Sequence, residues 1–451
     1  MRANTKMATA VLGIVVTYAS AAVSPEEAKQ LGTTLTPFGA IVAGNKEGTI
    51  PPYTGGLTKP PANYTKAGIY VDPFPDDKPQ YRIDASNWEE YKDKLTPGTV
   101  AMLQKYPKTF FLDVYPTRRS AAYPKTVLDN SVKNATRCAL TSDGTGIDTS
   151  KGCGGGVPFA IPKTGQEVLW NRLARYLGAG VVRTSVYDYV KPSGEVVNTG
   201  VGDHFFAHPF SDPGSELADI LYVSRLEYKG PTRLAGAVSL AFDSVKDSSR
   251  RAYSYQPSTR RVRLAPDFAA DTPISASGGA QLYDDEMLFN GTPDRFEWKL
   301  IGKEERLIPY NSYRFSWPVA GAGCSPKEYE TPFHFKADCM RWELHRVWHI
   351  TGTLKEGKRH VYSKRDLYLD EDTLTTGTAE NYDQAGKLYK FNLAPTTPMY
   401  DALIPGYADQ IFIDMVSGIW AVNRTADVWL PYKLTPAMLA PDSAAAHILR
   451  K

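Results

Sequence analysis

One stretch of the sequence carries polar side chains at alternate positions. Glu343, His345 and His349 share a face if residues 343–353 form a β-strand. Two imidazoles and a carboxylate are suitable zinc ligands, and a zinc-bound water would support hydrolysis. The spacing supplies no third His or Cys, so we prefer a solvated polar face. We therefore expect no bound metal and no cofactor.

Two acidic clusters and one basic strand could also bind ligands. Residues 284–286 (Asp-Asp-Glu) and 370–372 (Asp-Glu-Asp) offer carboxylates for calcium or for acid–base chemistry. Neither has the spacing of a calcium loop, so turns that face water at strand ends explain them better. Arg261 and Arg263 alternate on one face, where they could hold an anionic head group through paired hydrogen bonds. Cross-strand pairing with the acidic clusters is the slightly favoured alternative.

Motifs for phosphate binding and nucleophilic catalysis are missing from the sequence. The glycine run 154–156 leads to Pro158, not to the Gly-Lys-Ser/Thr start of a helix, so it does not form a nucleotide cradle. No G-x-S-x-G elbow occurs, and nothing in the spacing of Ser, His and Asp singles out a nucleophile. We therefore expect a protein that is not an enzyme.

The elements that must position these residues are mostly strands. From about residue 180 onward the apolar pattern has a period of two, as in 181–190, 221–228 and 343–353, with turn signals between the runs. Thr164 and Glu167 form a capping box that predicts a helix over 165–177. Several strands after a few helices favour an α+β, mainly β fold, in which one large curved antiparallel sheet carries helices on one side.

Residues 22–163 form a segment rich in Pro and Gly. Short helices are predicted to begin near Ser24, Ser86 and Thr96, whereas 111–163 reads as loops. We expect this segment and the β region 164–451 to form one continuous domain.

Aromatic residues on the predicted strands suggest a ligand cavity. A large sheet that is apolar on one face would expose more apolar surface than soluble monomers tolerate. The helix at 165–177 and the N-terminal segment can cover only part of it. We therefore expect a cavity lined by Tyr255, Trp298 and Trp348, with Arg261 and Arg263 near its mouth. A closed aromatic core is the alternative.

The N-terminus and the cysteines indicate export. Residues 1–21 combine a basic start, an apolar stretch and a small-residue cleavage site, as in a secretory signal peptide. No Cys lies near the cleavage site, so we expect no lipid anchor. Each cysteine pair brackets a turn-rich loop with the same separation, which favours Cys138–Cys153 and Cys324–Cys339 disulfides over a zinc site.

The charge balance argues against nucleic acid as a partner. Lys and Arg number 52 and Asp and Glu 49, so the formal net charge is only +3. Binding to phosphate backbones needs a basic excess that this chain does not have.

A series of short stretches runs through almost the whole exported chain. They are 35–40, 44–45, 48–51, 114–119, 158–162, 165, 170–171, 255–257, 260–263, 289–291, 298–303, 309–311, 362–365 and 370–372. Together and in this order they resemble a bacterial family, the domain-of-unknown-function 1329 family. Leu374 departs from the family pattern, which has Trp after the acidic triplet.

The resemblance implies a fold and a role. The family is similar to LolA and LolB, periplasmic carriers with a half-open antiparallel β-barrel that shelters acyl chains under helices on its concave side. It also resembles components encoded beside resistance-nodulation-division type exporters. We therefore expect a periplasmic carrier for lipid or another hydrophobic molecule, accessory to such an exporter or to an outer-membrane protein. An envelope assembly factor without a small ligand, or a metal-dependent hydrolase at His345 and His349, are the alternatives.

Overall fold

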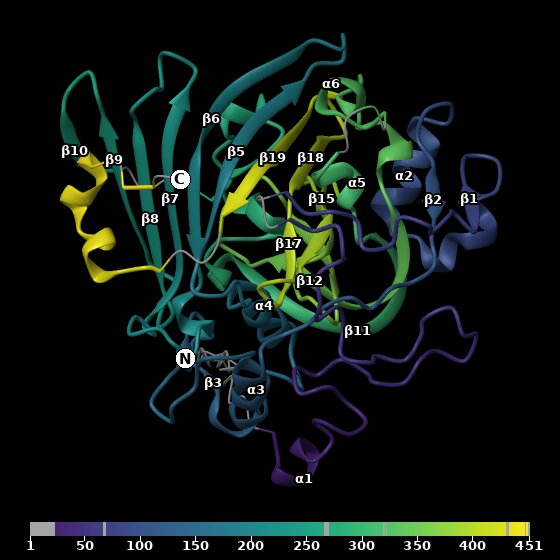
Figure 1. The fold of residues 1–451 in the computed structure, drawn as a ribbon, viewed down its shortest axis with the longest axis horizontal. Coiled ribbons are helices and arrows are strands. Elements are labelled where there is room, and N and C mark those ends of the chain that lie inside the picture. Colours follow the sequence, from purple (N-terminus) through teal and green to yellow (C-terminus); the bar gives the residue numbers. More distant parts are fainter. Residues whose placement is uncertain are drawn as a thin grey trace, which may run out of the picture.

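A computed structural model describes residues 23–65, 69–265, 270–318, 321, 323–429, 433–446 and 448–449 (Figure 1). The expected signal peptide, 1–21, lies outside these residues. Among the described residues, no helix has both the length and the apolarity needed to cross a membrane.

The fold is mainly β and is built on one 15-stranded sheet. Apart from a single parallel bridge between β2 and β12, its neighbouring strands are antiparallel. The sheet is not closed, because β10 pairs only with β9 and β11 only with β12 within the described chain. The predicted curved, half-open sheet is therefore confirmed. In the order of the sheet the strands are β1 (Tyr81–Ile83), β2 (Leu112–Val114), β12 (Trp342–Leu354) with β11 (Phe296–Pro309) at its side, β13 (Lys364–Asp370), β14 (Gly377–Tyr382), β15 (Leu388–Ala394), β18 (Gln410–Asp414), β19 (Trp420–Trp429), β5 (Val181–Val190), β6 (Val196–Ala207), β7 (Ile220–Gly230), β8 (Val238–Ser244), β9 (Arg250–Gln256) and β10 (Arg261–Leu264).

Short helices and two small hairpins surround this sheet. In Figure 1, α1 and α3 lie together below it, and α2 lies beside β1 and β2 at the right. The α-helices are α1 (Pro25–Ala28), α2 (Pro97–Lys105), α3 (Lys125–Arg137), α4 (Gly165–Leu173), α5 (Tyr313–Ser316) and α6 (Pro326–Tyr329). The 3-10 helices are η1 (Trp88–Lys94), η2 (Pro209–Ser211), η3 (Ser275–Ser277), η4 (Tyr283–Leu288), η5 (Pro293–Arg295), η6 (Ala337–Cys339), η7 (Pro436–Leu439) and η8 (Pro441–Ala445), and the hairpins are β3 (Ala139–Leu140) with β4 (Ile147–Asp148) and β16 (Thr396–Met399) with β17 (Ile404–Ala408).

Local signals in the sequence explain several of these elements. Thr164 caps α4 as predicted, because its side chain accepts from the Glu167 amide and the Glu167 carboxylate accepts from the Thr164 amide. The helix ends at Leu173, four residues before the predicted end at 177. Ser24 caps α1 in the same way. The helix predicted to begin at Ser86 is a 3-10 helix over residues 88–94.

Residues 111–163 contain a helix that the sequence did not predict. The 13-residue α3 buries Val127, Ser131, Asn134 and Ala135, so half of its buried side chains are polar. Ser131 and Asn134 bond to the backbone of Val157, at 2.9 and 3.2 Å. The interpretation of this region as loops alone was wrong. The helix begins after Pro124 without a side-chain N-cap, so the usual signal for a helix start is missing.

Both predicted disulfides are confirmed. The Cα atoms of Cys138 and Cys153 are 4.9 Å apart, and those of Cys324 and Cys339 are 5.6 Å apart. The first bond fixes the end of α3 to the loop that leads toward α4. The second closes the segment of α6 and η6 that precedes β12.

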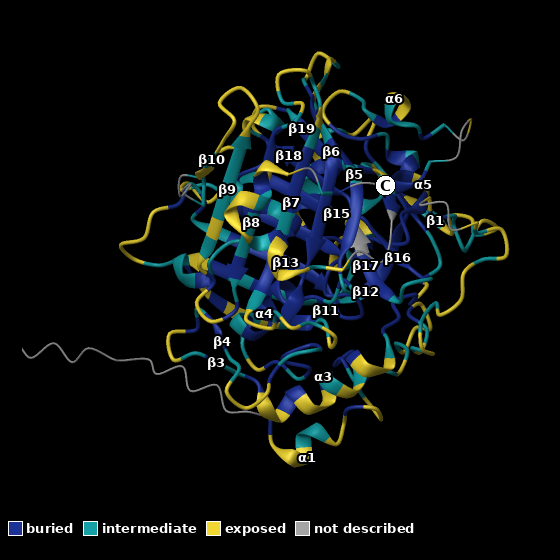
Figure 2. Cartoon of the chain, turned by 60° about the vertical axis from the view of Figure 1, so that its left-hand side comes forward, coloured by how far each residue is buried: buried dark blue, intermediate teal, exposed yellow. Residues whose placement is uncertain are grey.

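The largest buried apolar cluster lies between the sheet, α4 and residues 282–290, which we call the cap segment and which contain η4. Figure 2 shows the strands largely in the colour of buried residues, whereas α1 and α3 carry exposed faces. We call this largest buried cluster, between the sheet, α4 and the cap segment, the main apolar cluster. It includes Leu169 and Trp170 of α4, Phe206 and Tyr222 of the sheet, and Leu288 and Phe289 of the cap segment.

Candidate functional site

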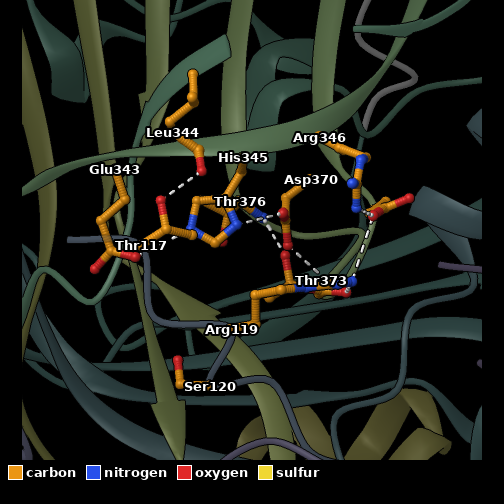
Figure 3. Close-up of polar contacts among 12 residues, drawn as sticks. Thr117, Arg119, Ser120, Glu343, Leu344, His345, Arg346, Asp370, Thr373 and Thr376 are labelled. Atoms are coloured by element: carbon orange, nitrogen blue, oxygen red, sulfur yellow. Dashed lines mark hydrogen bonds and ion pairs between the residues drawn. The ribbon is translucent and has the colours of Figure 1, made fainter. Parts of the chain in front are cut away.

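A buried polar cluster lies where residues 115–120, which follow β2, cross β12 and the turn after β13 (Figure 3). His345 lies between two carboxylates. Its Nε2 is 3.0 Å from Glu343 Oε2, and its Nδ1 is 3.3 Å from Asp370 Oδ1. Tyr310 stacks on the imidazole with a centroid distance of 4.0 Å. Burial alone would lower the pKa of His345, but hydrogen bonds and charges of Asp370 and Glu343 outweigh it and raise the pKa to about 9.

The acidic turn after β13 is neutralised by cations from distant parts of the chain. Arg119 binds Asp372 with two hydrogen bonds, of 2.8 and 2.7 Å, and lies 3.3 Å from Glu371. Lys303 of β11 donates to the other oxygen of Glu371 at 2.7 Å. The Ile41 amide donates to that same oxygen at 3.1 Å, so the cluster also holds the N-terminal segment against the sheet.

Two expectations from the sequence are wrong here. Glu343, His345 and His349 do share one face of β12, but that face is not solvated, since Glu343 is 0% and His345 1% exposed. The turn at 370–372 does not face water either, because all three of its residues are buried. In both cases the charges are compensated by buried partners whose positions only the tertiary fold supplies.

The cluster contains the one potential metal-binding group found among the described residues, formed by His345, Asp370 and Asp372. These donors already have partners. Both nitrogens of His345 face carboxylates, and both oxygens of Asp372 accept from Arg119. A cation here would have to displace Arg119, whose own positive charge opposes its entry.

We therefore predict that the purified protein carries no stoichiometric metal. Elemental analysis of periplasmically expressed protein checks this directly. One zinc per chain, lost in His345→Ala but retained in His334→Ala, would contradict the prediction and would favour a metal-dependent hydrolase.

Two cavities border residues 115–120, the segment that contains Arg119. One, of about 350 Å³, is lined by Asp77, Tyr115 and Arg341 among others. The second, of about 340 Å³, is lined by Leu57, Thr117 and Arg119 among others. Charged groups dominate the wall of the first, whereas loop residues that include Pro51, Leu57 and Phe74 line the second.

The other acidic cluster anchors the cap segment to the sheet. Arg365 of β13 is 0% exposed, and its guanidinium bonds Asp284 at 2.5 Å and Asp285 at 2.6 Å. Tyr362 donates to Asp285 at 2.9 Å. The expectation that 284–286 faces water was therefore also wrong.

The backbone of the cap segment is strained next to this anchor. Met287 and Leu288 have φ angles of 52° and 74°, in the left-handed region of backbone conformation that residues other than glycine rarely adopt. Each such residue costs on the order of 1–3 kcal/mol unless its surroundings impose the conformation. Here Gln410 accepts from the Met287 amide at 2.6 Å, and Arg172 of α4 donates to the Met287 carbonyl.

A third cavity, of about 270 Å³, opens beside the cap segment. Charged residues, among them Asp243, Arg250 and Asp284, form part of its wall. Leu173 of α4 and Leu221 of β7 also line it, and both belong to the main apolar cluster. This cavity therefore reaches from the surface to side chains of the main apolar cluster.

The structure separates the residues predicted to line a ligand cavity. Trp298 is buried in the main apolar cluster, where Gly352 gives its ring room, since a Cβ atom there would lie 2.7 Å from the ring. Trp348 borders the same cluster, with the Lys303 ammonium 4.3 Å from its ring centroid. Tyr255 lies on β9, many strands away in the sheet order, and none of the three lines the cavities described above.

Arg261 and Arg263 are exposed on β10, at the end of the sheet. The acidic clusters that they were expected to pair with bind Arg365 and Arg119 instead. The sequence reasoning did not single out Arg119, Arg365 or Arg172. For Arg172 a signal exists, because it follows Leu169 by three positions and so falls on the apolar stripe of α4.

The fold and the cap segment define a class of protein with an open antiparallel sheet, whose apolar face is covered by a helix and by a cap segment that polar contacts hold in place. The chain also has two disulfides, of the kind that exported proteins carry. The chain belongs to the family described as "Protein of unknown function (DUF1329)", whose model matches residues 82–432. The uncharacterized protein PA3922 of Pseudomonas aeruginosa is 38% identical over 411 residues, which cover 90% of this chain and 89% of that protein.

Solved structures similar to this chain include two from other bacteria. A DUF1329 family protein from Desulfovibrio piger is 15% identical with a TM-score of 0.42, and the match covers 61% of this chain and 95% of that one. A putative outer membrane lipoprotein-sorting protein domain from Vibrio parahaemolyticus is 14% identical with a TM-score of 0.43, over 62% and 97% of the two chains.

Proposed function

We propose that this protein is a non-enzymatic periplasmic carrier for a lipid or another hydrophobic molecule. The observation that carries the proposal is the strained cap segment, which covers the main apolar cluster and is held in place by polar contacts. Its partner in the envelope is a resistance-nodulation-division type exporter or an outer-membrane protein, as the family resemblance suggests.

The energetics favour a segment that opens. Strain at Met287 and Leu288 is released when the cap segment moves, which offsets part of the cost of breaking its contacts. Opening exposes aromatic and aliphatic side chains, and an acyl chain that covers them contributes about 0.8 kcal/mol for each buried methylene group. A chain of moderate length therefore stabilises the open form without any covalent step. The cavity beside Leu173 and Leu221 is the entrance that this opening would widen.

We expect a fluorescent fatty acid to bind the purified protein and to be displaced by phospholipid extract. Trp298→Ala should weaken this binding more than it lowers the melting temperature, because Trp298 belongs to the main apolar cluster. Trp342→Ala is the matched control, since Trp342 is buried in a different cluster and should lower the melting temperature without a specific effect on binding. Native mass spectrometry of the same sample identifies any lipid that co-purifies.

A protein that binds no probe, or in which every substitution under the cap segment merely unfolds the chain, would contradict the proposal. The main apolar cluster would then be a closed core, and an envelope assembly factor without a small ligand would be the better interpretation.

A further inference from the structure

Arg172 is a buried cation without an acidic partner. It is 0% exposed and lies on α4 between Trp170 and Leu173, which belong to the main apolar cluster. Nη2 donates to the Met287 carbonyl, whereas Nε and Nη1 have no hydrogen-bond partner. No carboxylate of the described residues lies within ion-pair distance of it, although the chain pairs the other fully buried arginines 183, 225 and 365 with acids.

Two further basic side chains lie close to Arg172. Arg175, one turn further along, is 3% exposed and donates to the Arg172 carbonyl at 3.4 Å. His208 is 1% exposed, and neither of its ring nitrogens makes a hydrogen bond. Burial, followed by the positive charges of Arg175 and Arg172, holds the pKa of His208 well below its usual value. The backbone of Leu221 and Leu173 raises this pKa, but by less.

Glu286 of the cap segment is an acid whose charge acts on Arg172, but the two form no ion pair. Glu286 of the cap segment raises the pKa of Arg172 slightly, but burial and Arg175 outweigh it and hold that pKa well below its ordinary value. The carboxylate of Glu286 is occupied elsewhere, since it accepts from Tyr222 at 3.0 Å and from Asn290 at 2.8 Å. The cap segment therefore gives Arg172 one carbonyl oxygen as a hydrogen-bond acceptor, whereas its Glu286 carboxylate acts on Arg172 without an ion pair.

Such an arrangement is costly unless something completes it. A buried donor left without a partner destabilises the fold, and more so when the group is charged. A guanidinium presents a planar fork that matches the two oxygens of a carboxylate or phosphate. Here the fork lies next to the basic groups Arg175 and His208, on a helix whose apolar residues belong to the main apolar cluster, so it suits the anionic head group of a molecule whose remainder is apolar.

We propose that Arg172 is the receptor for an anionic head group, a carboxylate or a phosphate, of an amphiphile whose apolar part lies in the main apolar cluster. This inference rests on the proposed carrier function and names its ligand class. The anion takes the Arg172 donors that are now unused and competes with the Met287 carbonyl for Nη2. Binding of the head group therefore also loosens the contact that holds the strained cap segment, so recognition and opening are coupled.

The test compares amphiphiles that differ only in charge. Hexadecanoate, hexadecyl phosphate and the neutral alcohol hexadecanol compete with the fluorescent probe for wild-type protein. We expect the better of the two anions to bind about tenfold to a hundredfold more tightly than the alcohol, the effect of a hydrogen bond to a charged group. The ranking of hexadecanoate against hexadecyl phosphate shows whether the carboxylate or the phosphate is the natural head group.

Arg172→Met should abolish the preference for anions while hexadecanol still binds. This variant should keep its melting temperature, because it replaces an uncompensated buried charge with an apolar side chain of similar length. Arg137→Met, which removes an exposed arginine at the end of α3, is the control for net charge and should keep the preference.

Three results would overturn the inference while the carrier function stands. These are equal affinity of the wild-type protein for anion and alcohol, a preference that persists in Arg172→Met, and a preference lost instead in Arg261→Met or Arg263→Met. The first comparison uses only wild-type protein, so it stands even if the variant does not fold. Absence of binding by every amphiphile would contradict both the inference and the carrier function.

Discussion

Replacing Arg119 by Met is expected to lower the free energy of unfolding by about 3–5 kcal/mol, the cost of breaking a buried ion pair by removing one partner. Arg119 is 7% exposed and Asp372 1%. Without the guanidinium, the carboxylate of Asp372 loses two hydrogen bonds, and that of Glu371 loses one of its cations. The remaining cations at 303 and 346 contact Glu371, so they do not replace the pair with Asp372.

Urea unfolding followed by tryptophan fluorescence measures this loss. Arg118→Met is the matched control, because the neighbouring Arg118 is 45% exposed in its pair with Asp77, and exposed pairs contribute only about 0–1 kcal/mol. Equal losses for the two variants would show that Arg119 does not compensate a buried charge. The Arg119→Met variant should also become more sensitive to protease near Ile41, since Arg119 donates to the Ile41 carbonyl at 2.8 Å.

The parts of the fold that could be predicted are those that local chemistry determines. The strand at 181–190 follows from its alternating pattern, and the start of α4 follows from the Thr164 and Glu167 capping box. The disulfides follow from two pairs of equal separation. Other elements have weaker signals: β6 carries glycines at 200 and 202 within its pattern, and α3 begins after Pro124 without a capping side chain.

The polar groups of the site could not be predicted because their partners lie far away in the chain. Arg119 and Asp372 are 253 positions apart, and Arg365 and Asp284 are 81 positions apart. A charged triplet in a sequence is normally solvated, and only the tertiary fold brings a buried arginine to it. Arg172 differs, because its position on the apolar stripe of α4 was readable while its lack of an acidic partner was not.

The contribution of His345 to stability is expected to depend strongly on pH. Its folded pKa of about 9 lies above its unfolded value of 6.5, so the folded state holds the proton more tightly. This contribution is fully present below pH 6.5 and is lost as the pH rises through 9. A difference of this size corresponds to about 3 kcal/mol for a fully buried group. Above pH 9 the imidazole is neutral and no longer compensates Glu343 and Asp370.

The measurement compares His345→Gln with wild-type protein from pH 6 to pH 9.5. Burial also raises the pKa of Glu330 to about 8 and that of Glu380 to about 7, so wild-type stability alone would mix several titrations. The difference between the two proteins isolates His345, and it should shrink by about 3 kcal/mol over this range. His334→Gln is the control, because burial lowers the pKa of His334. The unfolded chain therefore binds that proton more readily near pH 6, so wild type should gain stability relative to His334→Gln as the pH rises through 6.5 and then keep a constant difference, opposite in sign to the effect of His345. A constant difference for His345→Gln, or an imidazole that titrates near pH 6.5 by NMR, would show that Glu343 and Asp370 do not hold its proton.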